Sequence, residues 1–139
     1  IAAAGQGQSI LLVEDDDSVR LINREVLEEL GYQVTVAYDA EDALHQLKRI
    51  PSRDLLVADV GLPGMNGRQL AEVVQQIRPL TPVLFLTGYA ESAMDQADFL
   101  GPYMQLLTKP FTLDVLASRV ASMLTVDEAA IEELDIGQP

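Results

Sequence analysis

The sequence predicts an α/β fold in which helices cover both faces of a parallel β-sheet. Short, continuous apolar runs alternate along the chain with longer amphipathic segments, and turn-forming residues separate them. Uninterrupted apolar runs of this length are typical of strands that are buried on both faces, as in parallel sheets. Polar residues follow four of the runs directly, at the sheet edge where open α/β folds bind their ligands. The expected strands are residues 9–13, 33–37, 54–58, 82–86 and 104–107.

The first two strands are each followed by a predicted helix with clear ends. Asp17 or Ser18 caps the first helix, and Gly31 ends it. Asp39 caps the second helix, and Pro51 stops it because proline has no backbone N–H to donate. Helical spacing gives these helices apolar faces made of Val19, Ile22, Val26, Leu27 and Leu30, and of Ala40, Ala43, Leu44 and Leu47.

The second half of the chain continues the same alternation. A Gly- and Pro-rich loop over 61–67 follows the third strand, and Pro79 breaks the helix after it. A fourth helix is expected over about 90–99, and Thr112 caps a fifth. The expected inward residues of the third and fifth helices are Leu70, Val73, Val74, Ile77, Leu113, Leu116, Val120 and Leu124.

Five strand–helix units within 139 residues indicate one doubly wound domain. The expected architecture is a flavodoxin-like (βα)5 three-layer sandwich whose parallel strands lie in the order 2-1-3-4-5. The second strand ends in Val36, Ala37 and Tyr38, with no acid or base, which agrees with a place at the edge of the sheet.

The polar positions at the strand ends form a chemically specific set: Glu14 with Asp15, Asp59, Thr87 and Lys109. Three carboxylates, a hydroxyl and an ammonium make an oxygen-rich site that suits Mg²⁺, with Mn²⁺ as a substitute. Without a cation the carboxylates repel, by roughly 1 kcal/mol per pair at about 4 Å in water and about 4 kcal/mol at an effective dielectric constant of 20. A divalent ion removes that repulsion, so one carboxylate can act as a nucleophile and become an aspartyl phosphate.

Four longer motifs contain these positions: VEDDDSVR (13–20), DLLVADVGLPGMNG (54–67), FLTGYA (85–90) and LLTKPF (106–111). In this order and spacing they resemble the receiver domains of response regulators in two-component phosphorelays, over about residues 9–124. The last two motifs are most similar to receivers attached to hybrid sensor histidine kinases. The resemblance implies a cytoplasmic domain of bacterial signalling.

The resemblance implies a role for each polar residue. Asp59 would accept a phosphoryl group from the phosphohistidine of a histidine kinase or a phosphotransfer protein. Thr87 and Lys109 would contact that group, with a cis bond between Lys109 and Pro110 aiming the ammonium inward. The implied ligands of Mg²⁺ are Asp15, Asp59, the backbone carbonyl of Gly61 and, through a water, Glu14. The domain would thus catalyse its own phosphorylation and slow dephosphorylation without being a free-standing enzyme.

Three positions depart from the family pattern or bear on its switch. Leu106 stands where most receivers have Tyr or Phe, so the usual inward rotation of that ring cannot occur, and Tyr103 is a candidate substitute. Tyr89, two residues after Thr87, is expected to cover one flank of the phosphoryl group and to lengthen its lifetime. The output surface is expected on the fourth helix, fifth strand and fifth helix.

The remaining segments are expected to lie outside the receiver. Residues 1–8 read as a linker or remnant, and 125–139 as an acidic tail with five acids and no base. A fragment of a hybrid kinase is the preferred origin, and a stand-alone regulator is the competitor. The domain is expected to be a monomer or a weak phosphorylation-dependent dimer without membrane contact.

Charge and motif content weigh against other classes. A net charge of −13 predicts repulsion of nucleic acid, so any control of transcription would pass through a protein partner. A haloacid dehalogenase-type phosphatase would carry a second Asp where Gly61 stands, and a flavodoxin would not place Glu14 to Asp17 at its phosphate loop. A pseudo-receiver that acts as a phosphorylation-independent interaction module is the remaining alternative, although such modules typically lose a key acid or the lysine.

Overall fold

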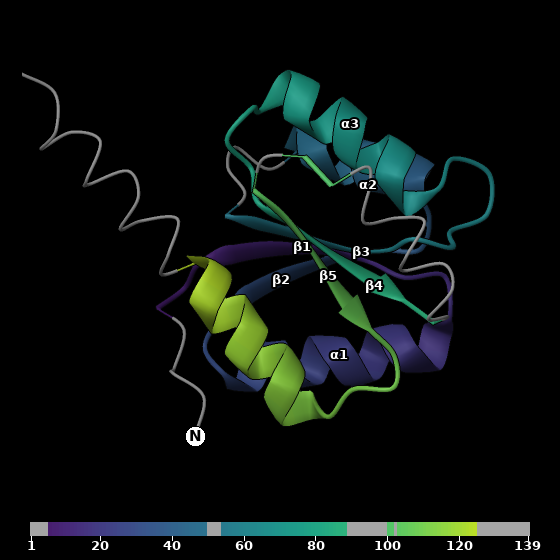
Figure 1. Cartoon of the computed structure of the whole chain (residues 1–139). Coiled ribbons are helices and arrows are strands. Elements are labelled where there is room, and N and C mark those ends of the chain that lie inside the picture. Colours follow the sequence, from purple (N-terminus) through teal and green to yellow (C-terminus); the bar gives the residue numbers. More distant parts are fainter. Residues whose placement is uncertain (1–5, 50–53, 89–99, 102, 125–139) are drawn as a thin grey trace, which may run out of the picture.

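The computed structural model describes residues 6–49, 54–88, 100–101 and 103–124. Its parallel strands form one sheet in the order β2-β1-β3-β4-β5, as the sequence predicts (Figure 1). The doubly wound, flavodoxin-like fold is therefore confirmed. The strands are β1 (Ser9–Val13), β2 (Gln33–Ala37), β3 (Leu55–Asp59), β4 (Val83–Thr87) and β5 (Met104–Thr108).

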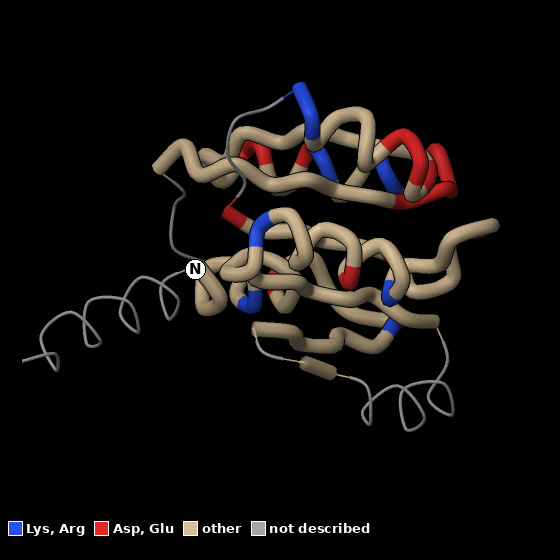
Figure 2. The backbone as a smooth tube through the Cα atoms, turned by 90° about the horizontal axis from the view of Figure 1, so that it is seen from above, with Lys and Arg blue, Asp and Glu red and all other residues tan. Residues whose placement is uncertain are grey.

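Helices cover both faces of the sheet. The helices α1 (Asp17–Glu29) and 113–124 lie on one face, and α2 (Ala40–Arg49) and α3 (Gly67–Ile77) lie on the other (Figure 1). In α2, acids occupy the first turn and bases the last, which complements the helix dipole (Figure 2). The predicted helix over 90–99, residues 1–5 of the expected linker and the acidic segment 125–139 lie outside the described residues. Within the described part of the chain, no helix combines the length and apolar character of a membrane span.

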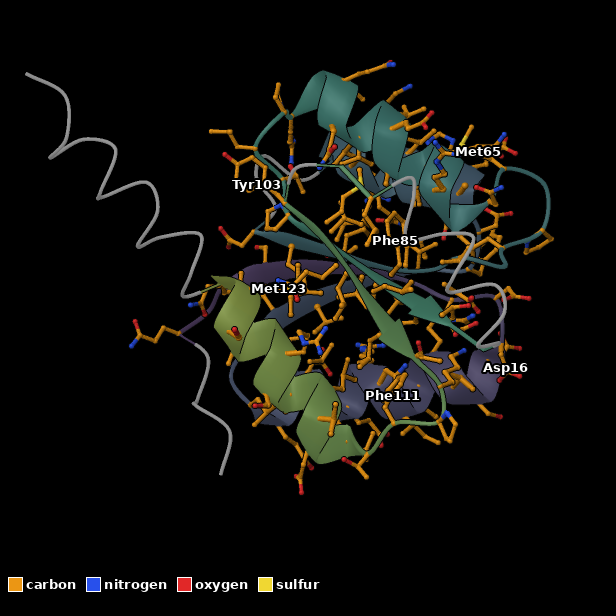
Figure 3. The ribbon with its side chains drawn as sticks, viewed as in Figure 1. Asp16, Met65, Phe85, Tyr103, Phe111 and Met123 are labelled. Carbon is orange, nitrogen blue, oxygen red and sulfur yellow. The ribbon has the colours of Figure 1, made fainter. Side chains whose placement is uncertain are left out.

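The sheet separates two hydrophobic clusters because successive strand residues point to opposite faces. In β1, Leu11 and Val13 join the cluster beneath α2 and α3, whereas Ile10 and Leu12 join the other. Phe85 belongs to the first cluster, and Met123, a residue of helix 113–124, belongs to the second (Figure 3). Both faces of the central strands are thus buried, which explains their continuous apolar runs.

The ends of the elements differ from prediction at several points. Asp16, and neither Asp17 nor Ser18, caps α1, since its carboxylate accepts a hydrogen bond from the Val19 N–H at 3.0 Å. The strands β3, β4 and β5 each run one residue further than expected, so that the ladder includes Asp59 and Thr87. Such shifts arise because hydrogen bonding, and not side-chain pattern, decides where a strand ends.

Three residues predicted to face the core are exposed. They are Ile22, Ile77 and Leu113, with 50%, 58% and 41% of their surface accessible. In α1 the buried position beside Ile22 is taken by Asn23, one turn before the buried Leu27, so the inward face is rotated from the predicted one. Ile77 and Leu113 are terminal residues of their helices, where no further turn shields them.

Candidate functional site

The turn after β1 carries the first two acids of the site. Glu14 is buried, with 1% of its surface exposed, and its backbone N–H donates to the Ala37 carbonyl at 3.1 Å. Its carboxylate accepts a hydrogen bond from the Asp16 N–H at 3.2 Å, while Asp15 is exposed. Glu14 is thus buried because it directly follows the apolar strand β1, whereas the turn after it leaves Asp15 exposed.

Asp59 ends β3 in the centre of the sheet edge. Its Oδ1 accepts a hydrogen bond from the Gly61 N–H at 2.9 Å, and 16% of its side chain is exposed. The following residue, Val60, remains tied to β4 through the Leu86 carbonyl at 2.9 Å. The Asp59 carboxylate is therefore held by the sheet on one side and by its own turn on the other.

Gly67 packs closely against the backbone of Asp59, a contact that the sequence did not predict. Its N–H donates to the Val60 carbonyl at 3.1 Å, and a Cβ at this position would collide with the Asp59 backbone carbonyl. Only glycine lets the first turn of α3 approach β3 so closely. The sequence feature that could have indicated this contact is a glycine directly after Asn66, the residue that caps α3.

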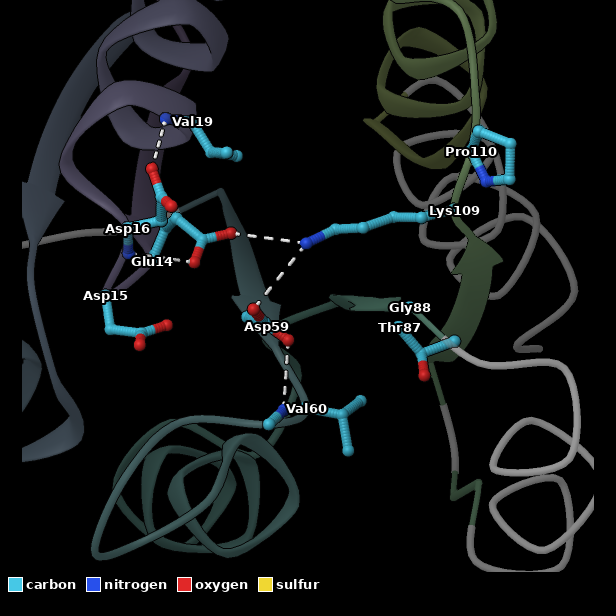
Figure 4. Close-up of a pocket in the computed structure, with 11 residues that line it drawn as sticks. Glu14, Asp15, Asp16, Val19, Asp59, Val60, Thr87, Gly88, Lys109 and Pro110 are labelled. Carbon is cyan, nitrogen blue, oxygen red and sulfur yellow. Dashed lines mark hydrogen bonds and ion pairs between the residues drawn. The ribbon is translucent and has the colours of Figure 1, made fainter.

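Lys109 reaches into the site from the end of β5. Its Nζ lies 3.5 Å from Glu14 Oε1 and 3.6 Å from Asp59 Oδ2, so one ammonium pairs with two acids (Figure 4). The bond to Pro110 is cis, as predicted, and the Lys109 N–H donates to the Thr87 carbonyl at 2.7 Å. This hydrogen bond joins the end of β4 to the base of the lysine.

The electrostatics of the site disfavour a charged Glu14. Burial, the largest cause, raises the pKa of Glu14 from 4.5 to about 7; the Asp16 N–H opposes this and the charge of Asp59 adds to it. Lys109 lowers the same pKa but does not offset the burial. Among the described side chains, Glu14 Oε1 is a buried oxygen without a hydrogen-bond partner. The positive charge near Glu14 is therefore too small to favour its ionised form as strongly as water would.

The donor set fits a divalent cation. One carboxylate oxygen from each of Glu14, Asp15 and Asp59 lies within 4.8 Å of the other two. All three ligands are hard oxygen donors, as Mg²⁺ requires, and a cation would also satisfy the buried Glu14 oxygen.

The structure brings most of the predicted site residues into one pocket. Its lining comprises Glu14, Asp15, Asp16, Val19, Asp59, Val60, Gly61, Thr87, Gly88, Lys109 and Pro110. The polar residues come from the carboxyl ends of β1, β3, β4 and β5, whereas β2 contributes none. The convergence expected from a parallel sheet is thus observed.

The three predicted switch residues lie elsewhere. Leu106 is partly buried in the middle of β5 and packs against the cluster beneath α2 and α3. Tyr103 precedes β5 at the opposite end from Lys109, is 42% exposed and has a φ of 63°. Tyr89 is outside the described residues. The roles of these residues stay predictions.

Comparisons with known proteins agree with this geometry. The family model of the response regulator receiver domain matches residues 10–121. The chain is 34% identical over 115 residues to the response regulator receiver protein CpdR of Brucella abortus (strain 2308), covering 83% of this chain and 95% of that protein. It is also 34% identical over 117 residues to the sensor kinase CckA of the same organism, covering 84% of this chain but only 12% of the kinase.

Solved structures show the same likeness. The crystal structure of a response regulator receiver protein from Sinorhizobium medicae WSM419 superposes with a TM-score of 0.80 at 28% identity, covering 88% of this chain and 98% of that one. The chain is therefore similar both to a free receiver protein and to a small part of a sensor kinase.

Proposed function

Because the chain belongs to the response regulator receiver domain family of two-component systems, we propose that Asp59 accepts a phosphoryl group from a partner phosphohistidine. The partner would be a histidine kinase or a phosphotransfer protein. The observation that carries the proposal is the convergence of Glu14, Asp15 and Lys109 on Asp59. The central carboxylate of such a set can be both neutralised and used as a nucleophile.

The proposed transfer is a single displacement at phosphorus. A carboxylate oxygen of Asp59 forms the new P–O bond, while the P–N bond to the donor histidine breaks and its electron pair remains on the imidazole nitrogen. Lys109, whose Nζ lies 3.6 Å from Asp59 Oδ2, would hold one phosphoryl oxygen, and the Thr87 hydroxyl would hold another.

Mg²⁺ is the proposed cofactor, with Mn²⁺ as a substitute. When bound, it would supply the positive charge that neutralises the acids and the transferring oxygens. Asp15, Asp59 and the Gly61 carbonyl would hold it directly, and Glu14 would hold it through a water. The buried Glu14 Oε1 supports this assignment, because it accepts no hydrogen bond and Lys109, at 3.5 Å, is shared with Asp59.

A route from the site to the far helix supports a switching role. Phosphorylation adds nearly two negative charges and three acceptors, which would draw Lys109 and Thr87 toward the new group. The two residues are joined by a backbone hydrogen bond, and Arg119 of helix 113–124 donates to the Leu106 carbonyl at 3.3 Å. A shift at the end of β5 would therefore reach that helix.

The alternative function is that of a phosphorylation-independent interaction module. Leu106, in place of the usual aromatic residue, raises this alternative only by removing the usual ring rotation from the output, since phosphorylation itself does not need that ring. Chemical mapping separates the two functions. The chain would be treated with a small acyl phosphate and Mg²⁺ and then with borohydride, which reduces an aspartyl phosphate to homoserine. Homoserine at position 59 supports the receiver function, whereas an unmodified Asp59 after exposure to both acyl phosphate and a phosphorylated kinase supports the alternative.

A further inference from the structure

We infer that Arg20 is a positioning residue that braces the turn carrying Glu14 and Asp15. Arg20 is not among the residues that line the pocket of the site, so it would act on the metal site through its hydrogen bond to the Glu14 backbone. The inference rests on the proposed cation site, because the placement of these two carboxylates matters most if they bind one.

The contacts of Arg20 span the whole turn. Nη1 donates to the Glu14 carbonyl at 2.8 Å, and Nη2 pairs with Asp17 Oδ1 at 2.6 Å. The Arg20 N–H also donates to the Asp16 carbonyl at 2.9 Å, within the first turn of α1. One planar side chain thus connects the first residue of the turn to its last.

The two side-chain contacts differ in strength. The Asp17 side chain is 90% exposed, so its ion pair with Arg20 lies in water and contributes little. The bond to the Glu14 carbonyl is partly buried and carries the charge of the guanidinium, whose side chain is only 19% exposed. The contact with the backbone is therefore the important one.

The Glu14 carbonyl is a sensitive point for the site. It belongs to the rigid peptide plane between Glu14 and Asp15, so its direction fixes how both side chains leave the backbone. The N–H of Glu14 is anchored to Ala37, and Arg20 anchors the carbonyl on the other side of the residue. Repulsion among the clustered acids would otherwise turn this plane and spread the carboxylates.

The geometry suits arginine specifically. Its planar fork presents two donors to two acceptors at once, whereas a lysine ammonium is a point donor on a flexible stem. Arg20→Lys should therefore keep part of the bracing of the turn, and Arg20→Gln should keep almost none of it. Arg24 offers a matched control on the same helix, because its ion pair with Glu28, at 3.3 Å, lies on the surface of the described structure.

The test combines Mg²⁺ titration calorimetry with amide hydrogen exchange of residues 14–17 in the metal-free chain. We expect Arg20→Gln to speed exchange in this turn and to weaken Mg²⁺ binding about tenfold, the lower end of losses seen when groups that orient metal ligands are removed. Arg20→Lys should fall between this variant and the native chain, and Arg24→Gln should match the native chain in both measurements.

Two results would overturn the inference. Exchange in the turn equal to that of the native chain would show that Arg20 braces nothing, and faster exchange with native Mg²⁺ affinity would show that the brace does not position ligands. Failure of the proposed cation site is distinguishable, because the native chain and Arg24→Gln would then also bind no Mg²⁺.

Discussion

Glu14 is a buried acid whose charge is costly in the metal-free protein. Burial raises its pKa from 4.5 to about 7. Between these values the folded chain binds more protons than the unfolded chain, so the free energy of unfolding must fall as the pH rises through this window. At about 1.4 kcal/mol per pKa unit, the loss amounts to roughly 3 kcal/mol.

Urea unfolding without metal at pH 4.5, 6 and 8 measures this loss. Glu14→Gln should flatten the dependence, because its side chain does not titrate. A native chain whose stability is the same at pH 6 and pH 8 would contradict the raised pKa.

Gly67 is expected to tolerate no side chain. Gly67→Ala places a Cβ against the backbone of Asp59, so we expect the free energy of unfolding to fall by at least about 2 kcal/mol. Gly101→Ala is the control, since its Cβ would meet only the flexible end of the Met104 side chain, the sulfur at 3.6 Å and the methyl carbon at 3.7 Å. Equal stability of the two variants, measured by urea unfolding, would contradict this account of the close approach.

At the residue scale, the sequence identified the acids, the hydroxyl and the lysine, because each follows an apolar run whose end is visible. It did not identify Arg20 or Gly67. Their contacts are with backbone carbonyls of residues brought near by a turn or a helix start, and no side-chain pattern encodes such contacts.

At the element scale, α3 is fixed at its start by a reciprocal cap. The Gln69 N–H donates to Asn66 Oδ1 at 2.9 Å, and the Asn66 N–H donates to Gln69 Oε1 at 3.0 Å. We expect Asn66→Ala to lower the free energy of unfolding by about 1 kcal/mol. A double-mutant cycle with Gln69→Ala should show coupling, because the two bonds support each other. Strictly additive losses would mean that the cap does not act as a unit.

The interiors of elements were more predictable than their ends. Continuous apolar runs specified the central strands β1, β3 and β4, because both faces of a parallel sheet are buried there. Which residue caps a helix depends on which side chain lies nearest to the free N–H groups of its first turn, as Asp16 shows. Whether the last or first residue of a helix is buried depends on how far the neighbouring elements extend over it, as Ile77 and Leu113 show.

At the scale of the whole molecule, the sheet brings four strand ends together and so links metal binding to global stability. A cation that binds only the folded chain should stabilise it by about 2.7 kcal/mol at a concentration 100 times its dissociation constant. We therefore expect Mg²⁺ to raise the thermal midpoint of the native chain, and Asp15→Asn to reduce that rise. A midpoint independent of Mg²⁺ up to tens of millimolar would argue against the cation site.

The strand order was predictable for the same reason as the site. The order β2-β1-β3-β4-β5 places the ends of β1 and β4 on either side of Asp59, with β5 next, and leaves β2 at the edge. The acidic net charge did not help to choose among α/β folds, since charge bears on partners and not on topology.

The most direct measurement is the intact mass of the chain after incubation with acetyl phosphate and Mg²⁺, beside Asp59→Asn and a sample with chelator. We expect the native chain with Mg²⁺ to gain one phosphoryl group and the other two samples to gain none. Labelling of Asp59→Asn to the same extent, or no labelling of the native chain by either acetyl phosphate or a phosphorylated kinase, would contradict Asp59 as the phosphoacceptor.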